Sequence, residues 1–377
     1  MDFTFTEEQQ AAAEAARGVF APVAPDTVPS PSLVAGTVAD DFDRALWAKL
    51  AEADLLSLLL DPEHGGAGLD AIALCLVLRE SAKVLARVPL LESVAAVAAV
   101  QAYGGEELKS ALLARAGRGE VVLTVAANGR SGHDPAELAV SARQDGDAWI
   151  LDGVQTAVPW AHTADFLVVP ARTATDRTLL AVIPRTHPGT GLGEQISTAG
   201  ERLGELRLES ARIAAHDVID AGGAWDWLRS LLTCGTCALA LGLGERVLAM
   251  TSEYTGKREQ FGFPVATFQA VAVQAADRFI DLRAMEVTLW QAAWRVASGA
   301  PGVLPASGDL AVAKIWASEG VRRVVQTAQH LHGGFGADVE YPLHRYHAWA
   351  KHLELQLGPA AAHEEALGDL LAAHPLG

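Results

Sequence analysis

Two stretches of the sequence combine residue types that could hold a charged aromatic ligand. The first, Tyr254 to Gln269, brings together an arginine, an amide and an aromatic ring as Arg258, Gln260 and Phe261. A fixed cation, a planar amide and a flat ring can pair with phosphates and stack on ring systems. The second reads Gln329-His-Leu-His-Gly-Gly-Phe-Gly336, whose glycines would let a phosphate or an adenine approach the backbone. Each motif is weak alone, but the ordered pair is specific.

A pair of cysteines in Cys234-Gly-Thr-Cys237 has the spacing of a redox or zinc half-site. It lies in a run rich in alanine and leucine that is typical of a helix, and no second pair completes a zinc site. We therefore predict two small buried core residues, with redox chemistry as the alternative, and we predict no metal site.

Composition and charge argue against several classes of partner. The formal net charge is −17, whereas nucleic acids and anionic membranes bind clustered lysine and arginine. Half of the 377 residues are hydrophobic, yet no run reaches the ~18 apolar residues of a membrane span. The surplus apolar surface is assigned to a large core or to subunit interfaces. The N-terminus lacks a basic region and an apolar signal core, and three cysteines fit a reducing compartment, so we expect a cytoplasmic protein.

Periodicity predicts the elements that position these motifs, beginning with an N-terminal helical domain over residues 1–118. Thr6 and Gln9 have the spacing of a capping box, which predicts a helix running to about Phe20. Apolar residues that recur every three or four positions predict further helices at 43–60, 69–86, 91–103 and 106–116.

The middle of the chain, residues 119–218, reads as a small antiparallel β-sandwich or barrel. Its short β-branched or alternating runs are separated by the turn dipeptides Asp145-Gly146 and Asp152-Gly153. Helical periodicity returns at Ala224. The long apolar segments that follow, the last of them at 343–371, predict a C-terminal four-helix bundle over residues 223–377.

The paired motifs resemble the flavin-binding signature of the acyl-CoA dehydrogenase family. The likeness extends to the N-terminal region, where Phe5 to Gln9, Leu46 to Leu50 and Pro62 to Leu69 look like that family's helical domain. The helix–sheet–helix order is also the family's three-domain architecture. The resemblance implies an α+β multidomain flavoprotein that removes a proton and a hydride from an acyl thioester.

The resemblance implies FAD as the cofactor, running between subunits. Arg258 would face the pyrophosphate, with Gln260 and Phe261 beside the adenosine. From a neighbouring subunit, the other side would be closed by Gln329, Gly333 and Gly334.

Other implied contacts leave alternatives open. Thr124, at a strand end, would offer its hydroxyl to the flavin pyrimidine. The family's loop that packs on the flavin ring aligns with residues 155–159, where its aromatic and hydroxyl residues are missing; Trp160 could fill the gap or be a plain core tryptophan. Gln269 could contact the ligand or bond the backbone at a helix start, and His332 could touch phosphate or be a satisfied interface histidine.

The most consequential difference between this sequence and the family pattern concerns the catalytic base. Aligning Ala350-Lys351 with the family's Ala-Lys puts Leu357-Gly358 where many members carry Glu-Gly. A leucine cannot abstract a proton. Glu354, one turn earlier, is the candidate for a relocated base; the alternative is that it is solvated or forms an ion pair between subunits. The other nearby acids are Asp226 and Glu340.

The tail around Lys351 to Gly358 resembles an actinobacterial steroid- and lipid-degradation branch, in which two different chains assemble and one can supply the base. Three hypotheses remain. The chain is an FAD-dependent dehydrogenase of an acyl-CoA or carrier-bound acyl group, with its base relocated or donated by a partner. Alternatively, it is a non-catalytic subunit of a hetero-oligomer, or a flavoprotein with different chemistry. The expected partners are the acyl thioester, a second copy or a paralogous chain, and an electron-transfer flavoprotein as acceptor.

Overall fold

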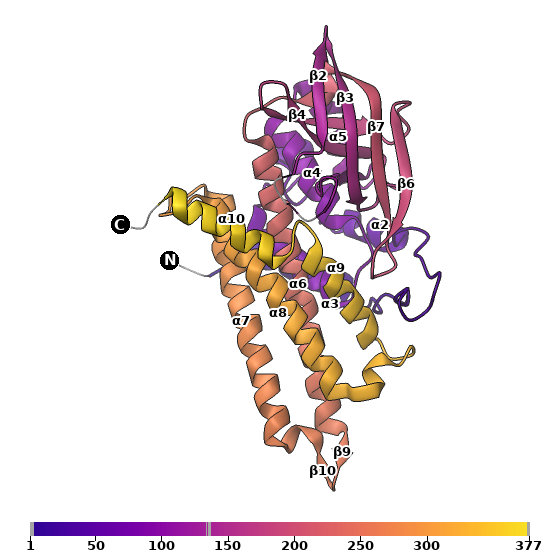
Figure 1. Cartoon of the computed structure of the whole chain (residues 1–377), viewed down its shortest axis with the longest axis vertical. Helices are drawn as coiled ribbons and strands as arrows, with labels where there is room; N and C mark the ends of the chain where they lie inside the picture. Colours follow the sequence, from indigo (N-terminus) through magenta and orange to yellow (C-terminus); the bar gives the residue numbers. More distant parts are fainter. Residues whose placement is uncertain (1–3, 133, 135–136, 375–377) are drawn as a thin grey trace.

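The computed structural model describes residues 4–132, 134 and 137–374, with helices towards both ends of the chain and a sheet between them (Figure 1). The N-terminal helices are α1 (Glu7–Phe20), α2 (Arg44–Glu52), α3 (Ala71–Lys83), α4 (Leu90–Tyr103) and α5 (Glu106–Gly117). The C-terminal helices are α6 (Ala224–Lys257), α7 (Gln269–Ser298), α8 (Ala306–His332), α9 (Leu343–Leu355) and α10 (Ala360–Ala373). This arrangement confirms the predicted α+β fold.

The first helix begins as predicted. Thr6 Oγ1 accepts a hydrogen bond from the Gln9 amide at 3.2 Å, and Gln9 Oε1 accepts one from the Thr6 amide at 3.0 Å, which completes a capping box. Gln9 also donates to the carboxylate of Asp70, which caps α3. The helix predicted at 43–60 is shorter than expected, because the chain turns into the left-handed region at Asp54.

The middle of the chain forms one eight-stranded mixed sheet in the order β6-β7-β3-β2-β4-β5-β8, with β1 beside β4. Its strands are β1 (Leu123–Val125), β2 (Val140–Asp145), β3 (Ala148–Val158), β4 (Phe166–Thr173), β5 (Thr178–Pro184), β6 (Thr190–Ile196), β7 (Arg202–Ala214) and β8 (Val218–Ile219). Most pairs are antiparallel, as predicted, but β4 runs parallel to both β1 and β2. The sequence did not predict β6.

One of the two predicted turn dipeptides is a turn and the other is not. Asp145-Gly146 joins β2 to β3, with Gly146 at φ 63°. Asp152-Gly153 instead lies inside β3, where the register against β7 shifts between Leu151 and Gly153. A Cβ on Gly153 would lie 2.3 Å from the Ala139 carbonyl oxygen. The glycine therefore marks a bulge and a close strand approach.

Helix α6 lies at the centre of the C-terminal bundle and contacts α7, α8 and α9 on one side and α3 and α4 on the other. It is long and apolar enough to cross a membrane, but 78% of its most apolar window is buried inside the protein. Cys234 and Cys237 are buried free thiols on this helix, as predicted for core residues. Burial raises the pKa of the Cys237 thiol to about 12, which keeps it protonated and unreactive.

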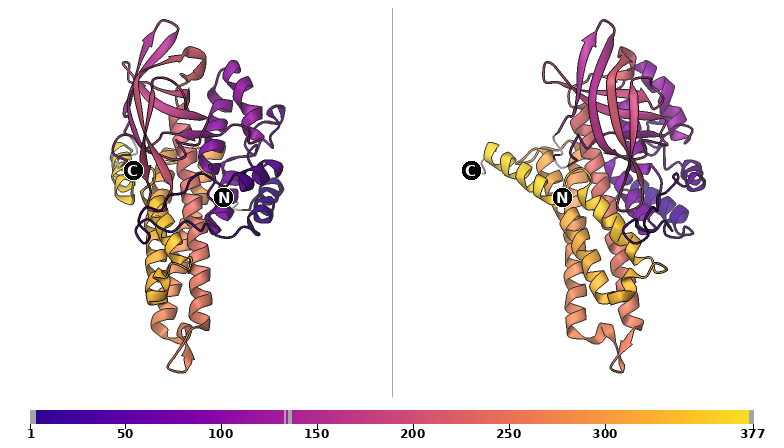
Figure 2. Two further views of the ribbon diagram at one scale, coloured as in Figure 1. Left: turned by 90° about the vertical axis from the view of Figure 1, so that its right-hand side faces the viewer. Right: turned by 45° about the vertical axis from the view of Figure 1, so that its right-hand side comes forward.

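The last predicted helix, 343–371, is two helices. The chain leaves α9 through Leu357 and Gly358, both at positive φ, and Pro359 precedes α10. The end of α9 is held by Lys314, a fully buried residue of α8 whose Nζ donates to the carbonyls of Leu353 at 3.3 Å and Glu354 at 3.1 Å. Figure 2 shows α10 projecting beyond the bundle.

Candidate functional site

The first motif forms an exposed hairpin at the far end of the bundle (Figure 1). Arg258 caps α6 and leads into β9 (Glu259–Gln260), which pairs with β10 (Phe263–Pro264). Phe261 and Gly262 both have positive φ, as in the tight turn of a two-residue hairpin. Phe261 is 90% exposed, and its ring meets that of Phe268 edge to face at 6.3 Å. The hairpin therefore presents a cation and an aromatic ring to solvent.

The second motif is a glycine turn at the end of α8. Gly333 has a φ of 61°, and a Cβ on Gly333 or Gly334 would meet nothing within 4 Å, so both backbones face open space. Gln329 Nε2 donates to the Gly333 carbonyl at 3.0 Å. A Cβ on Gly336 would lie 2.8 Å from the same nitrogen. Gln329 thus braces its own turn, and its predicted ligand contact stays a prediction.

Stacked rings join the two motifs. The ring of Tyr254, on α6, lies 4.3 Å from that of His332 and 5.4 Å from that of Phe335, nearly parallel to both. His332 has a partner at each nitrogen, the Ala328 carbonyl at 2.8 Å and the Tyr341 hydroxyl at 3.2 Å. Burial lowers the pKa of His332, so it is neutral at pH 7. The satisfied-histidine interpretation is the one that the structure supports.

A cavity of about 420 Å³ opens beside this stack. Its ionisable lining comprises three cations and one glutamate, together with the two tyrosines: Arg246, Lys257, Arg258, Glu253, Tyr254 and Tyr341. In a chain of net charge −17, such a local excess of cations is what a phosphate-bearing ligand needs. Gln269, the first residue of α7, is exposed nearby, and its predicted ligand contact stays a prediction.

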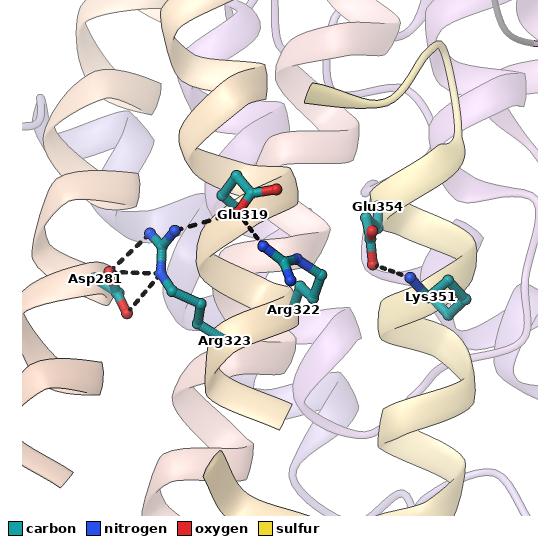
Figure 3. Close-up of polar contacts among 6 residues, drawn as sticks. All are labelled: Asp281, Glu319, Arg322, Arg323, Lys351 and Glu354. Carbon is teal, nitrogen blue, oxygen red and sulfur yellow. Dashed lines mark hydrogen bonds and ion pairs between the residues drawn. The ribbon is translucent and has the colours of Figure 1, made fainter. Parts of the chain in front are cut away.

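Leucine occupies the expected base position and is packed into the fold. Leu357 is 6% exposed at φ 58°, and its carbonyl lies 2.9 Å from Nε2 of His363, on α10. The carboxylate of Glu354 pairs with Lys351 on the same helix at 2.6 Å (Figure 3). Asp226 is exposed and pairs with Arg229 at 3.4 Å. An exposed or ion-paired carboxylate is a weak base for an α-proton.

A second cavity, of about 890 Å³, lies between α6, α8 and α10 beside Leu357. Thr233 and His363 contribute polar groups to its wall, and its acids Asp134, Glu365 and Asp369 are exposed to solvent. Burial lowers the pKa of His363 to about 4, so it is neutral at pH 7. This cavity has the size of a ligand pocket, but none of the described residues that line it is a buried acid.

If Glu354 is only an ion-pair partner, Glu354→Gln will leave activity unchanged. We expect the bound flavin and the rate of its reduction to match those of the unsubstituted protein, with the free energy of unfolding falling by no more than about 1 kcal/mol. Flavin absorbance and stopped-flow reduction measure the first two. A loss of reduction by orders of magnitude would identify Glu354 as the base after all.

The predicted ring-side residue, Thr124, is fully buried, and its hydroxyl donates to the Pro159 carbonyl at 2.6 Å. Its predicted contact with the flavin pyrimidine stays a prediction. The next residue along the chain from that proline, Trp160, takes a left-handed conformation with φ 56° and is 8% exposed. Its Nε1 donates to the carboxyl of Glu92, on α4, at 3.1 Å.

Glu92 is a residue that our interpretation of the sequence missed. Burial raises the pKa of Glu92 to about 7, although the Trp160 indole bonds to its carboxyl. A signal did exist, because Glu92 is the only charged residue in the apolar run Leu90–Val100. Local patterns, however, do not show what such a buried carboxyl meets in another domain.

Comparison with known proteins shows which family the chain belongs to. The family descriptions "Acyl-CoA dehydrogenase, N-terminal domain" and "Acyl-CoA dehydrogenase, C-terminal domain" match residues 6–120 and 233–371. Acyl-CoA dehydrogenase FadE27 of Mycobacterium tuberculosis is 37% identical over 339 residues, which cover 89% of this chain and 90% of the relative. The chain belongs to the acyl-CoA dehydrogenase family. The predicted resemblance is thus confirmed, and FAD, as predicted, is the cofactor of this family.

Two solved structures of similar proteins cover nearly the whole chain. One is the ChsE4-ChsE5 complex from Mycobacterium tuberculosis, with 35% identity, a TM-score of 0.89 and full coverage of both chains. The other is a glycine-to-alanine variant of the steroid acyl-CoA dehydrogenase Tcur3481-Tcur3483, with 35% identity and a TM-score of 0.88, covering 97% of this chain and 98% of that one. Both names pair two different chains.

The exposed Arg258, the ring of Phe261 and the open glycine turn fit the phosphate and adenosine portions of FAD. At the predicted ring end, the Thr124 hydroxyl donates to Pro159 and the Trp160 Nε1 donates to Glu92. Among the described residues, no group of three or more His, Cys, Asp and Glu side chains could hold a metal ion.

Proposed function

We propose that this chain is one subunit of a hetero-oligomeric, FAD-dependent acyl-CoA dehydrogenase, and that a paralogous partner chain supplies the catalytic base. The observation that carries the proposal is the state of the base position. Leu357 stands there, buried and left-handed, and the adjacent acid Glu354 is paired with Lys351. A family member with leucine at the base position needs a carboxylate from elsewhere, and we assign it to a partner chain.

The contribution of this chain is the half-site at the bundle tip. Arg258 would pair with a phosphate, Phe261 would cover the adenosine, and the backbone at Gly333 and Gly334 would approach the diphosphate. When bound, FAD supplies the acceptor for the substrate's hydride. The flavin ring and the acyl thioester would then lie against the partner, whose carboxylate removes the α-proton. An electron-transfer flavoprotein is the proposed acceptor of the electrons.

The paired relatives support this assignment. ChsE4-ChsE5 and Tcur3481-Tcur3483 are each named as two different chains, and the latter is named a steroid enzyme. We extend the two-chain assembly to this protein and leave its acyl group open between a coenzyme A and a carrier-bound thioester. A purely scaffolding subunit, which would bind no part of the cofactor, is disfavoured by the cations and open glycine turn at the tip.

Flavin content tests the proposal. The full chain is purified alone and after co-expression with a paralogue that carries Glu-Gly at the position of Leu357, and FAD per chain is read from the visible spectrum. We expect little FAD on the chain alone and about one FAD per pair of chains in the complex, because in the proposed assembly the partner completes one ring-side site per pair. Stoichiometric FAD on the chain alone would overturn the proposal, and so would a failure of the two chains to co-purify.

A further inference from the structure

The cavity between α6, α8 and α10 plays no part in the proposed function. It has a volume of about 890 Å³, a buried inner end and an open mouth. The inner end is formed by residues that the fold buries: Thr233, Leu310, Ala311, Leu357 and His363. The mouth lies along α10, where the lining residues are exposed: Glu365, Ala366, Asp369 and Ala373. A cavity of this size can enclose most of a drug-sized molecule.

Most of the wall is apolar. Leucine and alanine side chains line it from α8, from α10 and from the linker between α9 and α10: Leu310, Ala311, Leu357, Ala362, Ala366, Leu370 and Ala373. Hydrocarbon that covers such a wall leaves water, which is favourable, and the wall itself is desolvated at the same time. A ligand that fits this cavity therefore has an apolar body.

His363 presents a hydrogen-bond acceptor at the inner end. The residue is 8% exposed, and its Nε2 bonds to the Leu357 carbonyl at 2.9 Å. A carbonyl can only accept, so Nε2 carries the ring proton. Burial lowers the pKa of the imidazole to about 4, so Nδ1 is unprotonated at pH 7. None of the described residues donates to Nδ1, which leaves a lone pair on a residue of the cavity wall.

The α6 hydroxyls on the same wall also act as acceptors. Thr233 Oγ1 donates to the Arg229 carbonyl at 2.8 Å, and Ser230 Oγ donates to the Asp226 carbonyl at 2.6 Å. A hydroxyl has one proton, which these helix carbonyls take, whereas its oxygen can still accept. Thr233 is 5% exposed, so it is a second buried acceptor of the inner end. A buried acceptor without a donor is costly, and a ligand hydroxyl can supply that donor.

Charge around the cavity disfavours an anionic ligand. Three exposed carboxylates belong to its lining, those of Asp134, Glu365 and Asp369. Within the described part of the chain, the lining has one cation, Arg229, which pairs with Asp226 at 3.4 Å. Because like charges repel, a fatty acid or a coenzyme A thioester would enter an unfavourable field. A neutral ligand would not.

We propose that this cavity binds a neutral apolar alcohol, whose hydroxyl donates to His363 at the inner end while its hydrocarbon body covers the leucine and alanine wall. Thr233 is the second acceptor within the same wall. The site needs no cofactor and no partner chain. The inference thus goes beyond the proposed function, in which the acyl thioester lies against the partner, and either can fail without the other.

Calorimetric titration of the full chain at pH 7 with three probes of equal chain length tests the proposal. 1-Decanol carries a donor, decyl methyl ether has the oxygen without the donor, and decanoate is an anion. We expect 1-decanol to bind at least about tenfold more tightly than either of the others. Equal affinities for the alcohol and the ether would overturn the proposal. Tighter binding of decanoate, or no binding of 1-decanol, would also overturn it.

His363→Phe keeps a ring at this position and removes the acceptor. It should weaken the binding of 1-decanol by about tenfold and leave the affinity for the ether unchanged. His374→Phe is the matched control, because His374 is exposed at the end of α10 and does not line the cavity. That variant should bind all three probes as the unsubstituted chain does.

Thr233→Val is the second variant, since His363 also holds the Leu357 carbonyl and its replacement can impair folding. Valine has nearly the shape of threonine but lacks the oxygen, and the change leaves the His363 bond intact. It should weaken 1-decanol by about threefold or more, again without an effect on the ether. Unchanged affinity for 1-decanol in both variants would overturn the assignment of the inner end as the hydroxyl site.

Discussion

Arg258→Ala should weaken the binding of FAD to the two-chain enzyme by about 10- to 100-fold. Arg258 is exposed at the end of α6, and within the described part of the chain no carboxylate pairs with it. A charge-assisted bond to phosphate is worth more than a neutral one, and alanine removes it entirely. Lysine would recover only part of the affinity, because it lacks the planar fork of the guanidinium. Fluorescence titration of the apoprotein complex with FAD measures the effect.

Arg17→Ala is the matched control for this change. Arg17 is also an exposed helical arginine, with 56% of its side chain accessible, but it lies on α1. It should leave FAD affinity and chain assembly unchanged. Equal FAD affinity in Arg258→Ala and wild-type complexes would remove the bundle tip from the cofactor site.

Gly242→Ala should destabilise the fold by ~3 kcal/mol or more, or prevent folding. Gly242 lies on the face of α6 that packs on α3, and a Cβ there would stand 2.0 Å from the Arg79 carbonyl oxygen. Backbone cannot move aside as a flexible side chain can, so the two helices would have to separate. Their separation would also disturb the ion pairs of Arg79 with Glu245 and Glu286. Chemical denaturation measures the loss.

Gly256→Ala, on the same helix, is a control with the opposite expected effect on the free energy of unfolding. A Cβ on Gly256 would meet nothing within 4 Å, because this residue is exposed in the last turns of α6. Gly256→Ala should therefore gain ~0.5–1 kcal/mol from helix propensity alone. If both alanines had the same effect on stability, the packing of α3 on α6 described here would be wrong.

Much of the fold could be predicted from local signals. The capping box of Thr6 and Gln9 set the start of α1, and periodicity separated the helical ends from the sheet. The errors have physical causes. Asp152-Gly153 has the composition of a turn, but its glycine serves a bulge under a neighbouring strand. The α9–α10 break was signalled by Gly358-Pro359, which an otherwise continuous apolar pattern obscured.

The candidate site could be predicted where its functional residues lie close together in the sequence. Arg258 and Phe261 belong to the hairpin segment at the bundle tip, and Tyr254 of the same motif stacks on Phe335 of the glycine turn. The hydrogen bond from Gln329 to Gly333 could not be predicted, because it depends on the shape of the turn. The contact of Glu92 with Trp160 joins residues 68 positions apart, and only the packed fold brings them together. The cofactor and base assignments themselves stay predictions.

Anaerobic titration with acyl-CoA thioesters tests the central claim most directly. The chain alone, reconstituted with FAD, and its complex with a paralogue carrying Glu-Gly are each mixed with a panel of substrates while the visible flavin band is followed. We predict that no substrate bleaches the chain alone and that at least one bleaches the complex, with bleaching lost when the partner's base becomes glutamine. Bleaching of the chain alone would show that it contains its own base and would contradict the account.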